Sequence, residues 1–250
     1  MTASVARGFY RAGYPEIYDL VMRHRGRDHT AEAATLARTV RRRNPAAASL
    51  LDVACGTGLH LEHLRTHFAP VTGVDLSAEM LARAGARVPD VALHEGDMRE
   101  LNLDAAFDVV VCLFAVPHLR GAAELDRTVA RLRAHLTPGG VLVVEPWYTP
   151  EALVPGYVAR DMVQEQDRVV VRLSHSTWLD DARDRIRMTV HQAYADPEAG
   201  IRHDTATTEL TLFRPEHFAA AFARAGLAAS HVTAPPFRWG LWIARPADAR

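Results

Sequence analysis

The chain has 250 residues, of which 48% are hydrophobic and 24% are charged. This balance is typical of a globular protein and excludes disordered, collagen-like and coiled-coil classes. Its 29 basic and 30 acidic side chains give a formal charge of −1, so no overall positive field attracts nucleic acid or anionic lipid. No lysine is present, which excludes Schiff-base chemistry. We therefore expect a folded protein with neither a nucleic-acid nor a membrane partner.

The sequence also predicts the compartment. The longest apolar run, residues 109–116, is far shorter than the roughly 20 residues of a membrane span, and no basic-then-apolar leader opens the chain. Cys55 and Cys112 lie in apolar segments without zinc spacing, which is typical of buried free thiols. We expect a cytoplasmic protein that binds no metal.

The first 48 residues predict a helical cap. Apolar residues follow a helical pattern over residues 16–24 and 31–43, and Asn44-Pro45 ends the second helix. This segment precedes the first predicted strand.

Residues 49–147 alternate short apolar runs with helical stretches. Strands are predicted at residues 49–54, 71–76, 91–94, 107–114 and 140–145, and helices at 59–68, 78–87 and 124–136. Nearly continuous apolar strands that alternate with helices indicate a doubly wound, Rossmann-like α/β sheet that is covered on both faces.

The pattern changes after Trp147. Residues 169–176, 185–194 and 205–213 alternate polar with apolar side chains, which predicts an antiparallel β meander inserted over residues 148–213. Residues 214–250 then predict a helix that ends at Gly226 and two strands, 227–233 and 240–244, which complete the main sheet.

The most informative segment is the turn after the first strand, Asp52-Val53-Ala54-Cys55-Gly56-Thr57-Gly58. A glycine turn at the carboxyl end of such a strand lets a ligand approach the backbone closely. A dinucleotide fingerprint needs a further small residue where Leu61 stands, and a phosphate-binding P-loop needs a lysine. The turn therefore predicts a ligand that presents no phosphate there.

Two acids follow at the ends of the next strands. Asp75 comes 17 residues after Gly58, where a carboxylate can accept both hydroxyls of a ribose. Asp97 and Met98 end the third strand and suit an adenine ring and its amino group. A turn-forming Asp52, a helix-capping Asp75 and a core Met98 are the structural alternatives.

These three motifs resemble those of the class I S-adenosylmethionine (SAM)-dependent methyltransferases. The wider chain is similar to the nucleotide-linked amino-sugar N,N-dimethyltransferases of macrolide pathways, which make desosamine-type and mycaminose-type sugars. The similar segments are PAAASLLDVACGTGLHLEH from residue 45, LHEGDMRE from residue 93, VVEPWY from residue 143, Pro-Gly-Tyr at 155–157, Leu-Ser-His-Ser at 173–176 and Thr-Leu-Phe at 211–213. This resemblance implies one or two methyl transfers to the amine of a thymidine-diphosphate (TDP)-linked deoxysugar, with S-adenosylhomocysteine (SAH) as product.

The resemblance also implies the site residues. Cofactor contacts fall on Tyr18, Arg27, Asp52, Ala54, Gly56, Thr57, Gly58, Asp75, Leu76, Asp97, Met98 and Phe114. Substrate contacts fall on Tyr10, Trp147, Tyr148, Ser174, His175, Ser176, Arg238 and Trp239. Strand alternation sends Ser174 and Ser176 to one face and His175 to the other, so these three cannot all point at one ligand.

His118, which follows the fourth strand, is the candidate catalytic residue. A sugar ammonium must lose a proton before it attacks the methyl group, and a neutral imidazole can take that proton. The alternatives are a positioning role, in which alignment of donor and amine supplies most of the acceleration, and a plain surface histidine.

The sequence departs from the family pattern at three places. Arg27-Asp28-His29 stands where relatives carry Lys-Asp-Tyr, Ala115-Val116-Pro117 where they carry small polar residues, and Trp239 where they carry arginine. The first difference affects the local contacts of the cap, and the other two indicate a different amine position, a different stereochemistry or an acceptor that is methylated only once. A methyltransferase for an aglycone or another amine, and a non-catalytic methyltransferase-like protein, are the competing hypotheses. A homodimer formed through the meander is possible.

Overall fold

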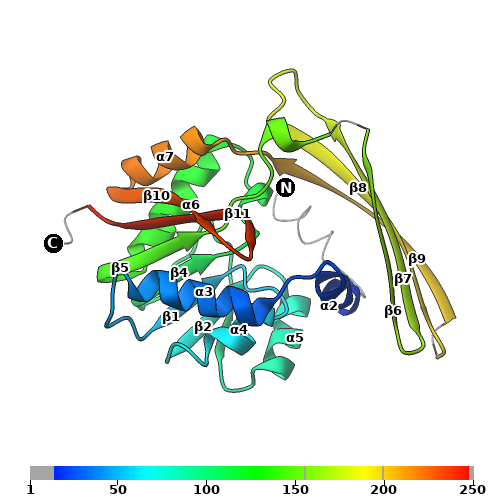
Figure 1. The fold of residues 1–250 in the computed structure, drawn as a ribbon, viewed down its shortest axis with the longest axis horizontal. Helices are drawn as coiled ribbons and strands as arrows, with labels where there is room; N and C mark the ends of the chain where they lie inside the picture. Colours follow the sequence, from blue (N-terminus) through cyan, green and yellow to red (C-terminus); the bar gives the residue numbers. More distant parts are fainter. Residues whose placement is uncertain (1–13, 155, 199, 248–250) are drawn as a thin grey trace.

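The structure, a computed structural model, describes residues 14–154, 156–198 and 200–247. Two sheets organise it: a seven-stranded sheet between two layers of helices, and a four-stranded antiparallel sheet that stands apart from it (Figure 1). The predicted doubly wound sheet, the helices that precede it and the antiparallel insertion are confirmed.

The seven-stranded sheet has the order β10-β11-β5-β4-β1-β2-β3. Its parallel strands are β1 (Leu50–Val53), β2 (Val71–Asp75), β3 (Ala92–Glu95), β4 (Phe107–Cys112) and β5 (Leu136–Val144). The hairpin of β10 (Leu227–Ala234) and β11 (Phe237–Pro246) joins antiparallel to β5. Since β1 is flanked by β2 on one side and β4 on the other, the connections reverse direction there, and such a switch point is where open α/β sheets bind ligands.

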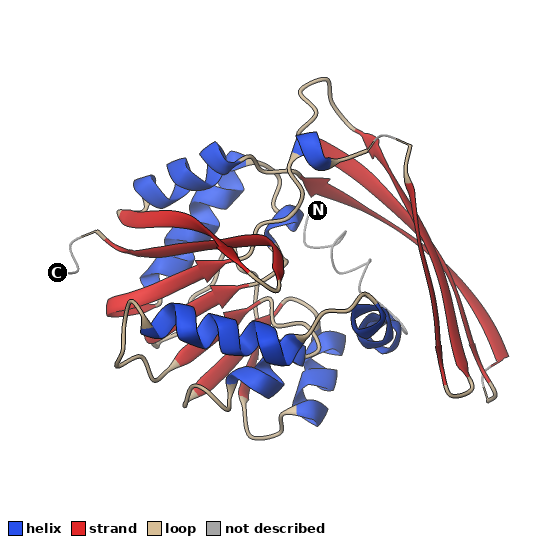
Figure 2. Ribbon diagram, viewed as in Figure 1, coloured by secondary structure: helices blue, strands red, loops and turns tan. Residues whose placement is uncertain are grey.

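Helices cover both faces of this sheet (Figure 2). On one face lie α3 (His29–Arg41), α4 (Leu59–Leu64) and α5 (Ala78–Arg87), and on the other lie α6 (Ala122–Ala134) and α7 (Pro215–Arg224). Within β4, Val109 and Val111 pack in the hydrophobic core on the side of α3 and α4, whereas Val110 and Cys112 pack in the core on the side of α6 and α7. Burial on both faces is why the strand reads as one continuous apolar run.

The helix ends follow local chemistry. Asp28 caps α3 by accepting a hydrogen bond from the amide of Ala31 at 2.9 Å, and Ser77 caps α5 by accepting one from Met80 at 3.2 Å. Helix α4 ends at Leu64, four residues before the predicted end. The Thr66 hydroxyl donates to the carbonyl of His63 there, a local bond that competes with continued helix.

The insertion has four strands: β6 (Val158–Glu165), β7 (Arg168–Trp178), β8 (Arg185–Asp196) and β9 (Gly200–Thr211). The sequence predicted three of them and missed β6. Its alternation is inverted, because Asp161 is buried whereas Met162 is 73% exposed. A pattern that assumes apolar residues inside cannot register such a strand.

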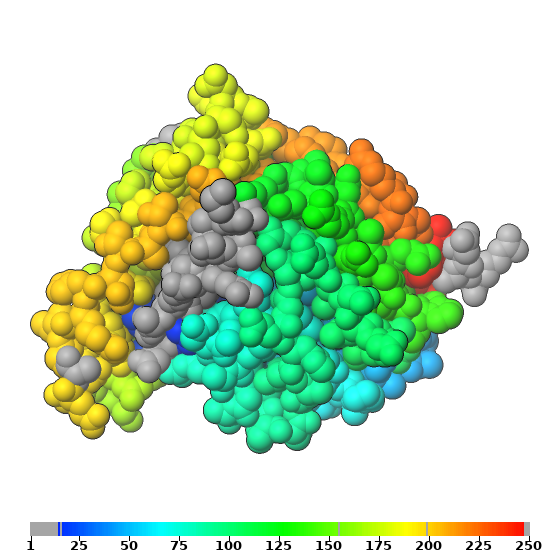
Figure 3. Space-filling model, turned by 180° about the vertical axis from the view of Figure 1, so that it is seen from behind, coloured from blue at the N-terminus to red at the C-terminus, as the bar shows by residue number. Residues whose placement is uncertain are grey.

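Helix α2 (Tyr14–His24) lies between the core and the insertion (Figure 1). Its residues Leu20 and Val21 pack with Val163, Val170 and Tyr194 of the insertion, and Leu59 of α4 belongs to the same cluster. In the space-filling view the insertion forms a lobe to one side of the core helices (Figure 3). None of the described helices is long and apolar enough to cross a membrane.

Candidate active site

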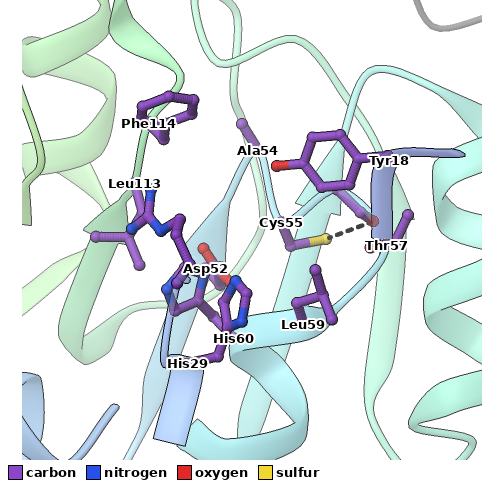
Figure 4. A pocket seen from close by; sticks show the side chains of 12 residues that line it. Tyr18, His29, Asp52, Ala54, Cys55, Thr57, Leu59, His60, Leu113 and Phe114 are labelled. Atoms are coloured by element: carbon purple, nitrogen blue, oxygen red, sulfur yellow. Dashed lines mark hydrogen bonds between the residues drawn. The ribbon is translucent and has the colours of Figure 1, made fainter. Parts of the chain in front are cut away.

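A pocket opens at the carboxyl ends of β1 and β4, at the switch point of the sheet (Figure 4). Seven of the predicted cofactor residues line it: Tyr18, Arg27, Asp52, Ala54, Gly56, Thr57 and Phe114. His29, Cys55, Leu59, His60 and Leu113 complete the lining. The other predicted cofactor residues, Gly58, Asp75, Leu76, Asp97 and Met98, lie outside this lining.

The backbone is left-handed in both segments that border the pocket, after β1 and after β4. Ala54 has φ +63° and Phe114 φ +57°, a conformation that costs a non-glycine residue about 1–3 kcal/mol and concentrates at functional sites. A Cβ added to Gly56 would meet no atom within 4 Å, so space for a ligand remains above the turn. Gly58 has φ +77°, and a Cβ added there would lie 3.1 Å from Cβ of Ala84, so the left-handed backbone and the close approach both favour glycine.

Asp75 lies directly beside the glycine turn. One of its carboxylate oxygens accepts a hydrogen bond from the amide of Gly56 at 2.8 Å, and the other accepts one from the amide of Ser77 at 2.9 Å. Burial raises the pKa of Asp75, and these backbone hydrogen bonds oppose the rise. Each oxygen keeps a lone pair for a ribose hydroxyl. The partly buried Leu76 follows it at the end of β2.

The predicted adenine residues are engaged within the protein. Asp97 forms an ion pair with Arg99, whose Nε lies 2.9 Å from one carboxylate oxygen. Met98 is partly buried and packs against the larger core cluster. Their contact with an adenine ring therefore stays a prediction.

Asp52 is the buried acid beneath the turn. Its side chain is 2% exposed, and burial, reinforced by the charge of Asp75, raises its pKa to about 8. Asp52 is therefore protonated at neutral pH, and its carboxylic acid can donate a hydrogen bond. Its role toward a ligand stays a prediction.

Arg27 connects two acids at the edge of the pocket. Its Nη2 lies 3.0 Å from Oε2 of Glu32 and 3.0 Å from Oε2 of Glu145. Its guanidinium carbon also stands 5.1 Å from the centre of the Phe114 ring, a cation–π distance. Sequence reasoning proposed Arg27 and missed both acids. Glu145 directly follows β5 and lies within the VVEPWY segment, which was the available signal.

The two acids titrate differently. Burial opposes ionisation of Glu32, but hydrogen bonds from His60 and Arg27 lower its pKa to about 2. Burial raises the pKa of Glu145 to about 7, and the charge of Arg27 opposes this rise. The net charge of the cluster of Arg27, Glu32 and Glu145 therefore changes near neutral pH, as Glu145 gains or loses its proton.

His29, Glu32 and His60 offer ligand atoms that all lie within 4.8 Å of one another, a spacing that a metal ion could use. Both Glu32 oxygens already accept hydrogen bonds from Arg27, and Nε2 of His60 lies 2.7 Å from Oε2. A guanidinium on the same carboxylate repels a divalent cation. We therefore interpret His29, Glu32 and His60 as part of a hydrogen-bonded cluster that supports the wall of the pocket.

Helix α2 is fastened to the glycine turn by Asp19, which sequence reasoning also missed. One oxygen of Asp19 accepts a hydrogen bond from the hydroxyl of Thr57 at 2.6 Å, and the other pairs with Arg87. Arg87 in turn donates to the carbonyl of Thr57 at 3.0 Å. Tyr18, the neighbour of Asp19, lines the pocket. The helix thereby holds its tyrosine over the cofactor turn.

A row of aromatic side chains leads away from the pocket. Ring centres are 6.2 Å apart for Phe114 and Trp147, 4.7 Å for Trp147 and Tyr148, and 4.7 Å for Tyr148 and Trp239. The guanidinium carbon of the exposed Arg238 lies 4.9 Å from the Trp239 ring. Four of the predicted substrate residues thus lie together.

The remaining predicted residues divide between faces. His118 ends the short 3₁₀ helix η1 (Val116–His118), is partly buried, and has its pKa lowered to about 4 by burial, so it is neutral at pH 7. Ser174 is buried and Ser176 partly buried on the inner face of β7, whereas His175 is exposed on the other face, as strand alternation requires. Tyr10 lies outside the described residues.

Comparison with known proteins identifies the relatives of this chain. A methyltransferase-domain family model matches residues 50–140. The chain is 46% identical to a dTDP-3-amino-3,6-dideoxy-alpha-D-glucopyranose N,N-dimethyltransferase of Streptomyces fradiae, over 95% of this chain and 92% of that protein. It is 44% identical to the dTDP-3-amino-3,4,6-trideoxy-alpha-D-glucopyranose N,N-dimethyltransferase of Streptomyces venezuelae, over 95% and 100%.

Solved structures give the same result. DesVI of Streptomyces venezuelae superposes with a TM-score of 0.87 at 43% identity, over 95% of this chain and 100% of that one. A SAM-bound amino pentose methyltransferase of calicheamicin biosynthesis from Micromonospora echinaspora superposes with a TM-score of 0.82 at 44% identity, over 92% and 96%.

The sheet order and the glycine-turn pocket define a class I SAM-dependent methyltransferase, and SAM is its cofactor. Within that class the chain belongs to the dTDP-amino-sugar N,N-dimethyltransferase family.

Proposed function

We propose that this enzyme methylates, in two successive transfers, the amine of a dTDP-linked deoxyamino sugar in antibiotic biosynthesis. The main support is that the similarity to enzymes named for such substrates spans 95% of the chain. It therefore includes the inserted sheet as well as the domain that forms the cofactor pocket. The relatives act on 3-amino and on 4-amino sugars, so the position of the amine defines the panel to be tested.

The pocket residues suit SAM by their chemistry. We assign Asp75 to the ribose hydroxyls, the amides of the turn at Gly56 to the methionine portion, and Arg27 to its carboxylate. This role of Arg27 is supported by Glu32 and Glu145, which accept its hydrogen bonds and hold the guanidinium in one orientation at the pocket edge. When bound, SAM supplies a methyl group already activated on a sulfonium.

The chain's own contribution is then to align the amine and to manage its proton. A free amine is a competent nucleophile, so correct alignment supplies much of the acceleration. The neutral imidazole of His118 can accept the ammonium proton or orient the amine. We assign His118 chiefly to positioning, and Trp147, Tyr148, Arg238 and Trp239 to the nucleotide-sugar.

The decisive experiment incubates the enzyme with SAM and a panel of 3-amino and 4-amino dTDP-sugars and follows product mass. The expected product gains two methyl groups, and the matched dTDP-sugar that carries a hydroxyl in place of the amine gains none. No gain on any member of the panel would refute the proposal.

The alternative, methylation of an aglycone or another amine, is separated by thermal stability. A ligand present at 100 times its dissociation constant stabilises the folded state by about 2.7 kcal/mol. Our proposal expects dTDP to raise the melting temperature, whereas the alternative expects no change.

We further propose that the enzyme is cytoplasmic and forms a homodimer. Two buried free cysteines and a nucleotide-sugar substrate support the compartment. The outward face of the insertion, with Val158, Met162, Val171 and Leu173 exposed, supports self-association through this sheet. Light scattering should give twice the chain mass, and Met162→Asp should return it to that of one chain. A wild-type mass of one chain would refute the dimer.

A further inference from the structure

Helix α2 is held by charged groups on both of its sides. Toward the core, Asp19 binds the hydroxyl of Thr57 in the glycine turn and pairs with Arg87 of α5. Toward the insertion, the guanidinium of Arg25, the residue that directly follows the helix, donates two parallel hydrogen bonds to the carboxylate of Asp161 in β6, at 3.0 and 2.7 Å. One short helix therefore touches both the cofactor turn and the inserted sheet (Figure 1).

The contact with the insertion continues along the sheet. Asp161 and Arg172 are direct cross-strand partners on β6 and β7, both less than 9% exposed, and Nη1 of Arg172 lies 3.2 Å from the Asp161 carboxylate. The same Nη1 lies 3.4 Å from Oγ of Ser174. A polar chain thus runs from Arg25 through β6 and β7 to Ser174, which the resemblance predicts to contact the substrate.

The Arg25–Asp161 contact is well suited to transmit position. A bidentate guanidinium–carboxylate pair fixes orientation as well as distance, and this carboxylate is shielded from solvent. The neighbouring pair of Arg23 with Glu165 also joins α2 to β6, but both of its side chains are 48% exposed. Exposed pairs of that kind are screened and contribute little.

From this geometry we infer that Arg25 and Asp161 are positioning residues that couple acceptor binding on the inserted sheet to donor binding at the glycine turn. The inference rests on the proposed function and on the predicted substrate role of Ser174 and Ser176 on the inner face of β7. An acceptor that orders β7 orders Asp161, and Arg25 then fixes α2 with Tyr18 over the pocket. By linkage, dTDP strengthens SAH binding by the same factor by which SAH strengthens dTDP binding.

The test is a calorimetric cycle on the full chain with SAH and dTDP as probes. For the wild type we expect saturating dTDP to lower the dissociation constant of SAH about fivefold or more. In Arg25→Gln we expect this factor to fall to about one, while SAH binding in the absence of dTDP is unchanged. The KM for the amino sugar rises in this variant, and kcat with saturating substrates changes less.

Arg25→Gln is chosen because it should fold. The Arg25 side chain is 34% exposed, and Asp161 keeps its ion pair with Arg172 when Arg25 is lost. Arg25→Lys keeps the charge and should restore part of the coupling, which a role in stability alone does not require. Glu209→Gln is the matched control, since it removes the ion pairs of Glu209 with Arg185 and Arg187 within the same sheet and should keep the full factor.

Two results would overturn the inference: an Arg25→Gln protein with the wild-type coupling factor, or a wild type that binds both ligands independently. Failure of the proposed function is recognised separately. In that case the wild type gives no dTDP signal at all although it binds SAH, and the coupling inference falls with the acceptor assignment.

Discussion

Replacement of Asp75 by alanine tests the orientation of the cofactor directly. A carboxylate has about four lone-pair sites, and the amides of Gly56 and Ser77 occupy two of them. Two sites remain for the two ribose hydroxyls. A hydrogen bond to a charged group contributes about 1.5–3 kcal/mol, so losing both costs about 3–6 kcal/mol. At 1.4 kcal/mol per factor of ten, the dissociation constant of SAH should rise about 100-fold to 10,000-fold.

The assay is calorimetric titration of SAH and of its 2′-deoxy analogue into the wild type, Asp75→Ala and the control Asp104→Ala, whose carboxylate is exposed. If Asp75 holds the ribose, loss of the 2′-hydroxyl weakens binding to the wild type and to the control much more than binding to Asp75→Ala. This ligand comparison separates the ribose contact from any disturbance of the glycine turn. An Asp75→Ala protein that binds SAH as the wild type does, or equal analogue penalties in all three proteins, would refute the assignment.

Three further expectations follow from charge and burial. Asp52 has a higher pKa in the folded protein, about 8, than in the unfolded chain, so its stabilising effect is complete below about pH 4 and is lost as the pH rises through 8. The melting temperature of Asp52→Asn should therefore rise relative to that of the wild type from about pH 5 to about pH 8, and a pH-independent difference would contradict this. Burial holds His118 neutral, with a pKa of about 4, so His118→Ala should lower kcat about tenfold or less and leave the pH–rate profile near neutral pH unchanged. A loss of kcat of about 100-fold or more would indicate an essential base. Arg27→Met leaves two buried acids without their cation and should cost about 3–5 kcal/mol in urea unfolding, against about 0–1 kcal/mol for Arg23→Met at the exposed pair; equal losses would show that the Arg27 cluster does not act as a buried network.

The cofactor half of the molecule was predictable because its signals are local. A continuous apolar run such as Val109–Val111 indicates a strand buried on both faces, and a glycine turn after the first strand marks the ligand edge. Asp75 stands at the end of β2, where the spacing from Gly58 placed it. Each of these statements depends on a few consecutive residues and on the geometry of parallel strands.

The missed features depend on pairing between distant segments. Asp161 looks like a surface residue until Arg25, 136 positions away, is brought against it. Glu145 and Arg27 are 118 residues apart, and although the VVEPWY segment draws attention to Glu145, it does not indicate that Arg27 is its partner. Strand β6 was missed for the same reason, since its buried acid reverses the expected alternation. An ion pair between residues far apart in the sequence produces no periodic pattern, so it cannot be recognised in a single sequence.

The four-stranded sheet shares no hydrogen-bonded strand with the main sheet among the described residues, and the chain enters it after β5 and leaves it before α7. Such an arrangement makes the lobe a transplantable unit for engineering. A chimaera that carries a relative's lobe should keep its affinity for SAM. Its sugar preference then shows how far the lobe selects the sugar, because Trp147, Tyr148, Arg238 and Trp239 stay those of the recipient. Because α2 belongs to the recipient, the graft must bring a carboxylate at the Asp161 position, or the first helix must be exchanged along with it.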